Sequence, residues 1–367
     1  MARVAHLTSV HPPYDTRIFH KECKTLVEAG YDVVLIVPHD RDEIVDGIKI
    51  RTVPKPKGRL SRMTRTAWQV YRAAIDENAA VYHFHDPELI PIGLLLRMRG
   101  KQVIYDVHED YITSIRQKKY LPHFLCLLLA SFWGKVETYI TKPFQIVLAE
   151  KYYTRRFPNG ITVLNYPIRT YFATLSNEGR HQPRLLYTGV VSEDRGALLY
   201  AQIVTLIDNV EVYIVGRCSK SLADRMRQMA GNKRDRLHIE GEGFHVPYSR
   251  ILDYYARGKW TSGLAIFPPT THYMEKELTK FFEYMETGMP IVCSDFPVWR
   301  SLIEETGAGL CVDPLDLKAI TNTIQYLVDH PEEAEEMSQN GRRAFETQYN
   351  WDSEAKKLIE LYSRLIR

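Results

Sequence analysis

The segment EKELTKFFEYMETGMPIVCSD, residues 275–295, contains a complete connection from a helix to a strand. Its pattern predicts a helix that is N-capped by Thr279, begins at Lys280 and ends after about two turns, because Gly288 and Pro290 are stop signals. The short apolar run IVCSD that follows is typical of a strand covered on both faces. This succession of helix and buried strand predicts an α/β fold.

The same alternation extends through the whole chain of 367 residues, a length that suggests two domains. Residues 1–167 contain the apolar runs VAHLTSV, YDVVLIV, IKIRTV, AVYHFH, QVIYDVH, FQIVLA and ITVL, and residues 184–349 contain RLLYTGV, VEVYIVG, RLHIEG, GLAIFPP, IVCSD and GLCVDP. We therefore predict two Rossmann-like, doubly wound domains that face each other across a cleft, with the polar segment 168–183 as the linker. The amphipathic segment 350–367 predicts a final helix that braces the first domain.

The composition excludes several other classes of protein. Five cysteines without a C-x-x-C pair argue against a zinc site or a disulfide framework and fit a reducing compartment. The N-terminus lacks a cleavable apolar signal, and the most apolar stretch outside a strand, 121–133, is too short to span a bilayer. No G-x-G-x-x-G follows a predicted strand, which disfavours nicotinamide and flavin cofactors. We expect a cytoplasmic protein.

The formal net charge of +3 conceals an asymmetry between the two halves. Residues 1–167 hold 24 basic and 17 acidic residues, a net charge of +7, which leaves −4 for the remainder. Most of the excess lies in Lys49–Arg72, which has eight basic residues, no acidic one, and the aromatic residues Trp68 and Tyr71. Such a segment suits an anionic membrane surface on the inner face of the plasma membrane. A solvated helix face and a nucleic-acid contact are the alternatives; we expect no nucleic-acid partner.

The segment 275–295 also carries the residues best suited to bind a nucleotide. Unpaired backbone N–H groups at the start of its helix favour a phosphate, and Lys280 adds positive charge in the first turn. Glu283 lies one turn further on, where its carboxylate can accept two hydrogen bonds from a ribose diol, and Glu275 can reach a sugar hydroxyl from the preceding loop. The alternative is a surface helix whose acids only stabilise the helix dipole.

Three other loops follow predicted strands, where open α/β sheets bind ligands. In YTGVVSEDRG, a strand ends at Gly189 and Arg195 falls in the first turn of the next helix. VYHFHDPEL and VIYDVHEDY place histidines and acids at two strand ends, and the first loop, TSVHPPYDTRIFHKE, adds Asp15 and Arg17. Asp15 is suited to orient or deprotonate an acceptor hydroxyl, or else to cap a helix that begins near Thr16. In VYHFHDPEL and VIYDVHEDY, the candidate ligand-binding residues are His85, His108 and Glu109.

These motifs together resemble the retaining glycosyltransferases of GT-B fold. Glu275 and Glu283 match the E-x7-E motif, and TKFFEYMETGMPIVCSD is similar to glycosyltransferase family four, in its K-x-F-E-Y-M-x-x-G-x-P branch. The resemblance implies that Glu283 binds the nucleotide ribose and that Glu275 contacts the donor sugar. It also implies that His108 faces that sugar, while His85, Glu109 and Arg17 lie elsewhere in the cleft.

The family's diphosphate loop, G-R-x-x-x-x-K-G, differs here in one position. Arg195 takes the place of the lysine, whereas Val190 replaces the arginine. We expect Lys280 to supply the missing charge, with Gly189 and Thr279 in the same diphosphate site. Because cationic side chains can replace Mg²⁺ and no D-x-D motif follows a strand, we predict metal-independent catalysis without a cofactor.

The resemblance implies transfer of a sugar from a nucleotide diphosphate to an acceptor with retention of configuration, through front-face attack in which the donor phosphate helps to take the proton. The basic first domain favours a glycan or lipid-linked acceptor, as in bacterial surface polysaccharide assembly. The alternatives are a nucleotide-sugar epimerase or a phosphorylase of the same fold, and a non-catalytic nucleotide-sugar-binding subunit, which the substitution at Val190 keeps open.

Overall fold

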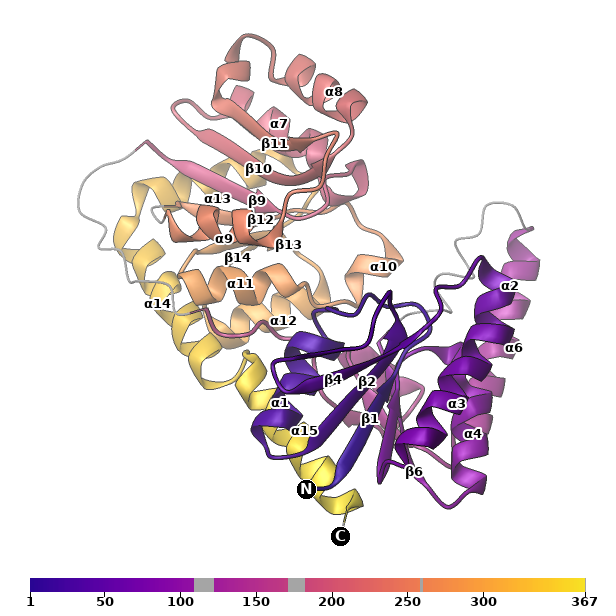
Figure 1. The fold of residues 1–367 in the computed structure, drawn as a ribbon. Helices are drawn as coiled ribbons and strands as arrows, with labels where there is room; N and C mark the ends of the chain where they lie inside the picture. The colour runs from indigo at the N-terminus through magenta and orange to yellow at the C-terminus, as the bar shows by residue number, and fades with distance from the viewer. Residues whose placement is uncertain (109–121, 171–181, 258–259, 367) are drawn as a thin grey trace. The chain divides into compact units, whose positions relative to one another are not determined.

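The protein was analysed as a computed structural model, which describes residues 1–108, 122–170, 182–257 and 260–366. The chain divides into two compact units (Figure 1). Unit 1 comprises Met1–Ile168 and Trp351–Arg367, and unit 2 comprises Arg169–Asn350. The predicted limits of the first domain, 167 and 350, differ from this division by one residue, whereas unit 2 begins at Arg169 rather than at the predicted residue 184. Most of the predicted linker, and the candidate residue Glu109, lie outside the described residues.

Unit 1 is built on an eight-stranded sheet of order β3-β4-β2-β1-β5-β6-β7-β8. The strands are β1 (Arg3–Leu7), β2 (Asp32–Pro38), β3 (Glu43–Val45), β4 (Ile48–Val53), β5 (Val81–Phe84), β6 (Gln102–Val107), β7 (Gln145–Leu148) and β8 (Ile161–Thr162). All neighbours pair in parallel except β3 and β4. Because the strand order reverses between β1 and β5, the loops at their carboxyl ends diverge and leave room for polar side chains.

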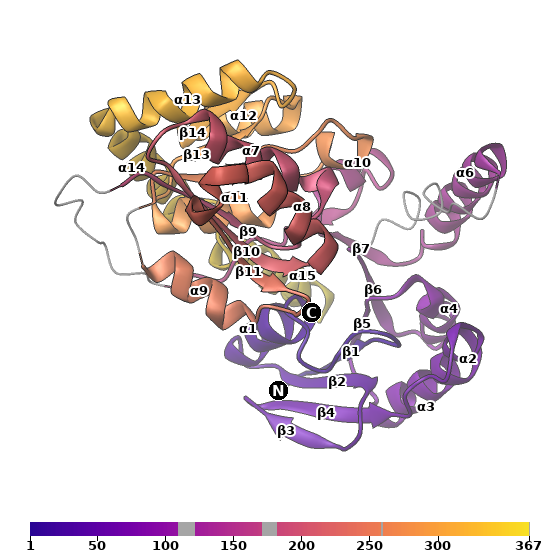
Figure 2. The ribbon, with the colours of Figure 1, turned by 90° about the horizontal axis from the view of Figure 1, so that it is seen from above.

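Helices cover both faces of this sheet (Figures 1 and 2). They are η1 (Ile18–Cys23, π-helical), α1 (Lys24–Glu28), α2 (Arg59–Ser61), η2 (Arg62–Thr66), α3 (Ala67–Glu77), η3 (Pro87–Leu89), α4 (Ile90–Met98), α6 (His123–Ile140), η4 (Lys151–Arg155) and α15 (Trp351–Leu365). Apolar residues of α3 and α4 pack on one face, and those of η1, α1 and α15 pack on the other. Each face therefore has its own hydrophobic core.

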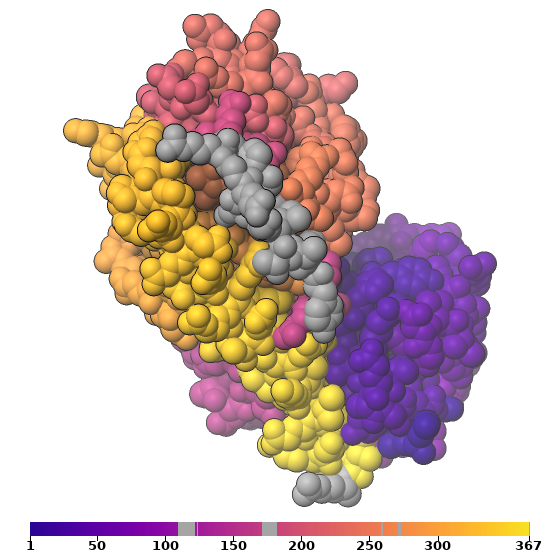
Figure 3. Space-filling view, turned by 90° about the vertical axis from the view of Figure 1, so that its left-hand side faces the viewer, coloured from indigo at the N-terminus to yellow at the C-terminus, as the bar shows by residue number. Residues whose placement is uncertain are grey.

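The last helix, α15, completes the second of these cores. Its residues Leu358, Leu361 and Tyr362 are buried with residues of η1, and the indole N–H of Trp351 donates to Thr25 Oγ1 at 2.9 Å. Figure 3 shows this helix, in yellow, lying against the indigo surface of unit 1. The final helix thus packs on the first domain, as its amphipathic pattern predicts.

Unit 2 is a second doubly wound unit, with a six-stranded parallel sheet of order β11-β10-β9-β12-β13-β14. The strands are β9 (Arg184–Thr188), β10 (Glu211–Cys218), β11 (Leu237–Glu242), β12 (Ser262–Ala265), β13 (Ile291–Ser294) and β14 (Gly309–Val312). The helices are η5 (Glu193–Arg195), α7 (Ala197–Leu206), α8 (Lys220–Ala230), η6 (Gly231–Arg236), α9 (Tyr248–Ala256), α10 (Thr271–Met274), α11 (Thr279–Thr287), α12 (Pro297–Thr306), α13 (Leu317–Asp329) and α14 (Pro331–Thr347). Its strand order reverses between β9 and β12.

The helix predicted from residues 275–295 is α11, and one detail of the prediction is wrong. The N-cap is Leu278, whose backbone is extended, and no side chain caps the helix. Thr279 is already helical, so its hydroxyl cannot reach forward to the N–H groups that an N-cap residue satisfies. The end of the helix is as predicted, because Gly288 adopts a left-handed conformation with φ of 69°. In the described part of the chain, no helix is both long and apolar enough to cross a membrane.

Candidate donor site and the polar network of unit 1

Glycines line the carboxyl edge of the unit 2 sheet. Gly189, directly after β9, donates its N–H to Val215 O at 2.9 Å. A Cβ atom on Gly216 would lie 1.8 Å from the carbonyl oxygen of Gly189, and one on Gly241 would lie 2.2 Å from that of Gly216. Three neighbouring strands therefore pack backbone against backbone at this edge. Sequence reasoning found Gly189 but missed the other two, although each ends an apolar run in the same way.

The side chain of Lys280, from the first turn of α11, faces this edge. Its Nζ lies 3.7 Å from the centroid of the Tyr187 ring, and a Cβ atom built on Gly189 would be 3.8 Å from it. Nζ is buried, with no hydrogen-bond partner among the described residues. Burial, reinforced by the nearby Arg195, holds the pKa of Lys280 well below its ordinary value. A buried amine without an acceptor is costly, so this position is suited to receive an anion.

Arg195, the residue at the lysine position of the loop, is a second cation near Lys280. It ends η5, and its Nε donates to Tyr273 Oη at 2.9 Å, while the Tyr273 hydroxyl donates to Asp194 at the same distance. The next residue, Gly196, has φ of 82°, and a Cβ atom there would lie 2.2 Å from Ile266 O. This turn therefore requires glycine. Val190, at the arginine position of the motif, is half exposed and contributes only its carbonyl, which accepts from Tyr187.

Glu283 lies one turn beyond Lys280 and is surrounded by tyrosines. Its carboxylate accepts from Tyr255 Oη at 2.8 Å and from Tyr248 Oη at 3.3 Å. Tyr255 also lies 2.7 Å from Thr188 Oγ1, which connects the carboxylate to the end of β9. Sequence reasoning missed both tyrosines, whose only signal is their spacing of seven residues on α9, two turns of one face. Tyr248 is half exposed, so a ribose diol can compete with it for Glu283.

The two remaining predicted residues of unit 2 lie on its surface. Glu275 is exposed directly after α10, and Thr279 is exposed at the first position of α11. A separate cavity of about 480 Å³ lies beside β11. It is lined by His238, Ile239, Glu240, Gly241, Glu242, Phe244 and Tyr254. The structure thus brings together Gly189, Arg195 and Lys280, with Glu283 one helical turn away.

Asp106, at the end of β6, is the centre of the polar network of unit 1. Arg17 donates to both of its oxygens at 2.8 Å, and His85 Nδ1 and His108 Nδ1 lie 3.1 and 3.0 Å from Oδ2. Burial alone would raise the pKa of Asp106, but Arg17 and His108 hold it well below its ordinary value. Sequence reasoning missed Asp106, although it named all three of its partners.

The contacts of Arg17 and His85 place them inside the unit. The Arg17 side chain is 5% exposed, and its third nitrogen donates to Val163 O at 3.0 Å. His85 is fully buried and lies 3.0 Å from His6 through its Nε2 atom. Both side chains therefore hold Asp106 in place inside unit 1 and are not accessible to a ligand. The side chain of His108 is 11% exposed, so it connects this network to the surface of unit 1, and its Nε2 atom lies 3.1 Å from His11 Nε2.

Of the two roles predicted for Asp15, capping is the one the structure contains. Asp15 Oδ1 accepts from the backbone N–H groups of Arg17 and Ile18 at 2.8 and 2.9 Å, and the helix begins at Ile18 rather than near Thr16. Burial would raise the pKa of Asp15, but hydrogen bonds from His11 and the backbone lower it. A carboxylate of lowered pKa is a weak proton acceptor, which argues against Asp15 as a general base.

The basic segment Lys49–Arg72 carries less free charge than its composition predicts. Several of its cations pair with acids from elsewhere in unit 1, at 2.6 to 3.1 Å. The pairs are Lys49–Glu77, Arg51–Asp42, Lys55–Asp40 and Arg62–Glu88. The segment nevertheless exposes Leu60, Met63 and Trp68. A second exposed apolar surface, which sequence reasoning missed, lies on α6, where Phe124, Leu127, Leu128, Leu129 and Phe132 are exposed.

Comparison with known proteins matches each half of the chain to a family of sugar-transferring enzymes. Residues 16–156 match the model described as Glycosyltransferase Family 4, and residues 177–344 match the model described as Glycosyl transferases group 1. A lipopolysaccharide core biosynthesis mannosyltransferase, LpsB of Rhizobium meliloti, is 26% identical over 138 residues, 36% of this chain. The chain spans about a third (35%) of the length of that curated relative.

Solved structures share the fold over nearly the whole chain. Sucrose-phosphate synthase from Thermosynechococcus elongatus superposes with a TM-score of 0.74 at 17% identity, covering 100% of this chain and 99% of its own. Anabaena HepE, in complex with UDP and glucose, superposes with a TM-score of 0.70 at 12% identity, covering 99% and 100%. Two doubly wound units with these neighbours define the GT-B class of glycosyltransferases. The family 4 model and the group 1 model match separate parts of the chain, residues 16–156 and 177–344, and together they identify it as a glycosyltransferase.

Proposed function

We propose that the protein is a retaining glycosyltransferase that transfers a sugar from a nucleoside diphosphate to an acceptor. The observation that carries the proposal is the buried Lys280 Nζ, which lacks a hydrogen-bond acceptor among the described residues and faces a glycine-lined sheet edge. A diphosphate at this edge would supply that acceptor, and the reversal of strand order between β9 and β12 is where such sheets bind nucleotides. The UDP bound by Anabaena HepE supports a nucleotide of this class.

The main chemical task is to stabilise the negative charge that grows on the departing diphosphate. Lys280, Arg195 and the first N–H groups of α11 are preorganised donors for that charge, and in many enzymes such donors account for most of the rate enhancement. In this proposal they replace a metal ion at the diphosphate, and no cofactor is required. Glu283 binds the ribose, Glu275 and His108 contact the donor sugar, and the donor phosphate assists the acceptor hydroxyl in front-face attack.

We further propose a lipid-linked saccharide acceptor at the inner face of a bacterial plasma membrane. The biosynthetic role named for LpsB supports a surface polysaccharide. The apolar face of α6, with Phe124, Leu128 and Phe132 exposed, is suited to insert at the lipid interface, and the uncompensated charge of unit 1 favours an anionic surface. Lys49–Arg72 then plays a supporting part, because half of its cations are already paired.

The donor is identified by a panel of nucleotide-sugars in thermal unfolding and turnover assays. A donor at about 100 times its Kd stabilises the folded state by about 2.7 kcal/mol. We expect one nucleotide-sugar to stabilise the wild type and the control Glu304→Gln, an exposed change on α12, but to stabilise Glu283→Gln far less. The same donor should be hydrolysed slowly to free sugar and nucleoside diphosphate without an acceptor.

Other outcomes separate the rival functions. Conversion of the donor into an epimeric nucleotide-sugar without an acceptor indicates an epimerase, and a requirement for inorganic phosphate indicates a phosphorylase. Binding without turnover by any lipid or sugar acceptor indicates a non-catalytic subunit. If no nucleotide-sugar binds, the assignment of Lys280 and Glu283 to the donor is wrong.

The membrane part of the proposal has its own measurement. At low salt, the wild type should sediment with anionic phosphatidylglycerol vesicles, and the double variant Phe124→Ser and Phe132→Ser should remain in the supernatant with unchanged donor binding. The control Tyr326→Ser removes a partly exposed aromatic residue from α13 of unit 2 and should sediment like the wild type. Equal sedimentation of all three proteins would assign membrane binding to a different surface.

A further inference from the structure

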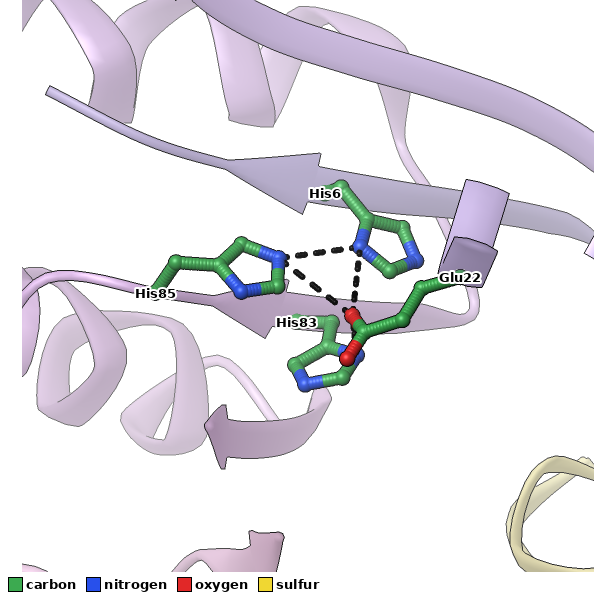
Figure 4. A group of neighbouring side chains, drawn as sticks. All are labelled: His6, Glu22, His83 and His85. Atoms are coloured by element: carbon green, nitrogen blue, oxygen red, sulfur yellow. Dashed lines mark hydrogen bonds and ion pairs between the residues drawn. The ribbon is translucent and has the colours of Figure 1, made fainter. Parts of the chain in front are cut away.

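Three histidines project from neighbouring strands onto one face of the unit 1 sheet. His6 of β1 is in register with His83 of β5, and His85 follows His83 by two residues, so all three side chains point to the same side. Glu22 of η1 faces them from the helical layer. Figure 4 shows the three imidazoles arranged around the Glu22 carboxylate. All four side chains are fully buried, at a position where parallel sheets ordinarily carry valine or isoleucine.

The ligand atoms of these residues are spaced as they are around one small cation. His6 Nδ1 lies 3.0 Å from His85 Nε2, and Glu22 Oε2 lies 3.7, 3.8 and 3.9 Å from His6 Nδ1, His85 Nε2 and His83 Nδ1. Bonds of 2.0 to 2.1 Å to a tetrahedral Zn²⁺ separate two ligands by roughly 3.4 Å. These four spacings lie within about half an ångström of that value, and one ligand atom from each of the four residues lies within 4.8 Å of the others, so small side-chain shifts are enough to bind a cation.

The opposite ring nitrogens of His6 and His85 are held as they are in metal sites, whereas His83 Nε2 is buried without a hydrogen-bond partner in the described structure. His85 Nδ1 lies 3.1 Å from Asp106 Oδ2, and His6 Nε2 lies 3.1 Å from the Tyr362 hydroxyl. A carboxylate or another oxygen behind each imidazole is the usual outer partner of a ligating histidine, because it fixes the tautomer and the ring orientation.

Glu22 is one of the buried residues whose polar atoms are left unsatisfied in the described structure. Both of its carboxylate oxygens are buried without a hydrogen bond in the described structure. Arg17 Nε is 3.2 Å from Oε1, but the Arg17 guanidinium is already directed at Asp106. Two buried carboxylates therefore share one guanidinium, and an unpaired buried carboxylate is strongly unfavourable. A divalent cation among the three histidines would satisfy Glu22 and balance this charge.

We propose that His6, His83, His85 and Glu22 bind one divalent first-row transition metal ion, for which Zn²⁺ is the best match, inside unit 1. Imidazole and carboxylate ligands favour such an ion, and a closed, fully buried set of four ligands is typical of a structural site. The cysteine pattern argues only against thiolate ligands. The four ligands belong to unit 1 and the diphosphate residues belong to unit 2, so this proposal does not depend on the proposed function.

A metal-free arrangement of the same residues is the specific rival. Hydrogen bonds can run from His83 Nδ1 through the Tyr362 hydroxyl to His6, and from His6 to His85 and Asp106, with distances of 3.0 to 3.1 Å at each step. This chain requires no metal and gives a partner to both nitrogens of His6 and His85, but it leaves His83 Nε2 and the Glu22 carboxylate without hydrogen bonds in the described structure. In the metal-bound form, His83 Nδ1 exchanges its contact with Tyr362 for the ion.

The test is the metal content of the untagged full-length protein, purified without metal-affinity chromatography and dialysed against a metal-free buffer. Inductively coupled plasma mass spectrometry should find about one equivalent of a single transition metal per chain in the wild type. Glu22→Gln keeps the shape of the side chain but removes the anionic ligand, and it should lose most of the metal. The control His20→Gln, an exposed histidine on the same π-helical turn, should keep it.

A second measurement covers the case in which Glu22→Gln fails to fold. Wild type stripped by a chelator during mild unfolding and refolded with Co²⁺ should show the intense visible absorption of a tetrahedral site, and Zn²⁺ should displace it. Wild-type protein that contains less than a tenth of an equivalent of any transition metal, and that shows no such absorption with Co²⁺, overturns the proposal in favour of the hydrogen-bonded chain.

Discussion

The carboxyl edges of the two sheets contain similar polar residues, but the buried cations are paired with acids in unit 1, whereas Lys280 of unit 2 has no acceptor among the described residues. In unit 1, Arg17 is paired with Asp106, and His11 lies between Asp15 and Asp86, within 3.5 Å of each. In unit 2, Lys280 has no acceptor in the described structure, and Arg195 adds to the positive potential. The comparison shows that the number of polar residues at a sheet edge does not identify a ligand site. The sign and the pairing of the buried charges do.

The largest expected effect follows from the paired edge. Asp106→Asn leaves the buried Arg17 without its bidentate partner, so we expect the free energy of unfolding of unit 1 to fall by roughly 3–5 kcal/mol. Urea unfolding followed by tryptophan fluorescence measures the change. Asp224→Asn, an exposed site on α8, is the control and should stay within about 0.5 kcal/mol of the wild type. A loss below about 1 kcal/mol for Asp106→Asn would mean that the network is not the support described above.

The unpaired edge should respond in the reverse manner. Lys280→Met removes a buried amine and keeps the length of the side chain, so the ligand-free protein should be as stable as the wild type or more stable. Nucleoside diphosphate binding should weaken about 10- to 100-fold, because a hydrogen bond to a charged group contributes roughly 1.5–3 kcal/mol. Calorimetric titration and thermal unfolding measure the two effects. Lower stability combined with unchanged affinity would place Lys280 among the structural residues.

The protonation of Lys280 on ligand binding gives a second test of the unpaired edge of unit 2. Burial holds the pKa of Lys280 well below 10.5 in the ligand-free protein, whereas a bound diphosphate would raise it again. Binding of UDP should therefore take up protons at a pH above the second phosphate ionisation, which is about 6. Titrations in buffers of different ionisation enthalpy measure the uptake, which should vanish in Lys280→Met. Uptake that persists in this variant would assign the proton to another group.

The paired edge of unit 1 should also show a pH dependence. Burial alone would lower the pKa of His11, but the carboxylates of Asp15 and Asp86 outweigh burial and raise the pKa to about 10. Because the folded-state value lies above the unfolded value of 6.5, the stabilisation by His11 is complete below pH 6.5 and is lost as the pH rises towards 10. The difference in unfolding free energy between wild type and His11→Gln should shrink over this interval. A difference that is constant with pH would show that His11 is neutral.

The sequence predicts most of the fold and part of the site. Alternation of apolar runs identified both sheets, and Gly288 fixed the end of α11, because these signals act between neighbours in the chain. The N-cap was misplaced by one residue, since an extended Leu278 can begin a helix as well as a capping threonine. The resemblance assigned Gly189, Arg195, Lys280 and Thr279, from two separate segments, to one diphosphate site. The structure brings the first three close together, whereas Thr279 is exposed.

What the sequence could not predict are partners that are distant along the chain. Asp106 is the common partner of Arg17, His85 and His108, which arrive from three different segments. The register of β1 with β5, which aligns His6 with His83, is likewise set by tertiary pairing. Tyr255 and Tyr248 bind Glu283 from another helix. Local patterns therefore predict which residues are polar at a strand end, but not which of them satisfy one another.

The packing of α15 has a consequence for how the protein is made. The contact between Trp351 and Thr25 joins residues 326 positions apart, and Tyr362 closes the histidine cluster of unit 1. During synthesis, the whole of unit 2 emerges from the ribosome before the core of unit 1 can be completed. Unit 2 is continuous in sequence and can fold first, while the first 168 residues have one apolar sheet face that is covered only in part, by η1 and α1. The half of the protein that is translated first is therefore the half that finishes folding last, and a nascent chain stalled before residue 351 would expose that face to chaperones.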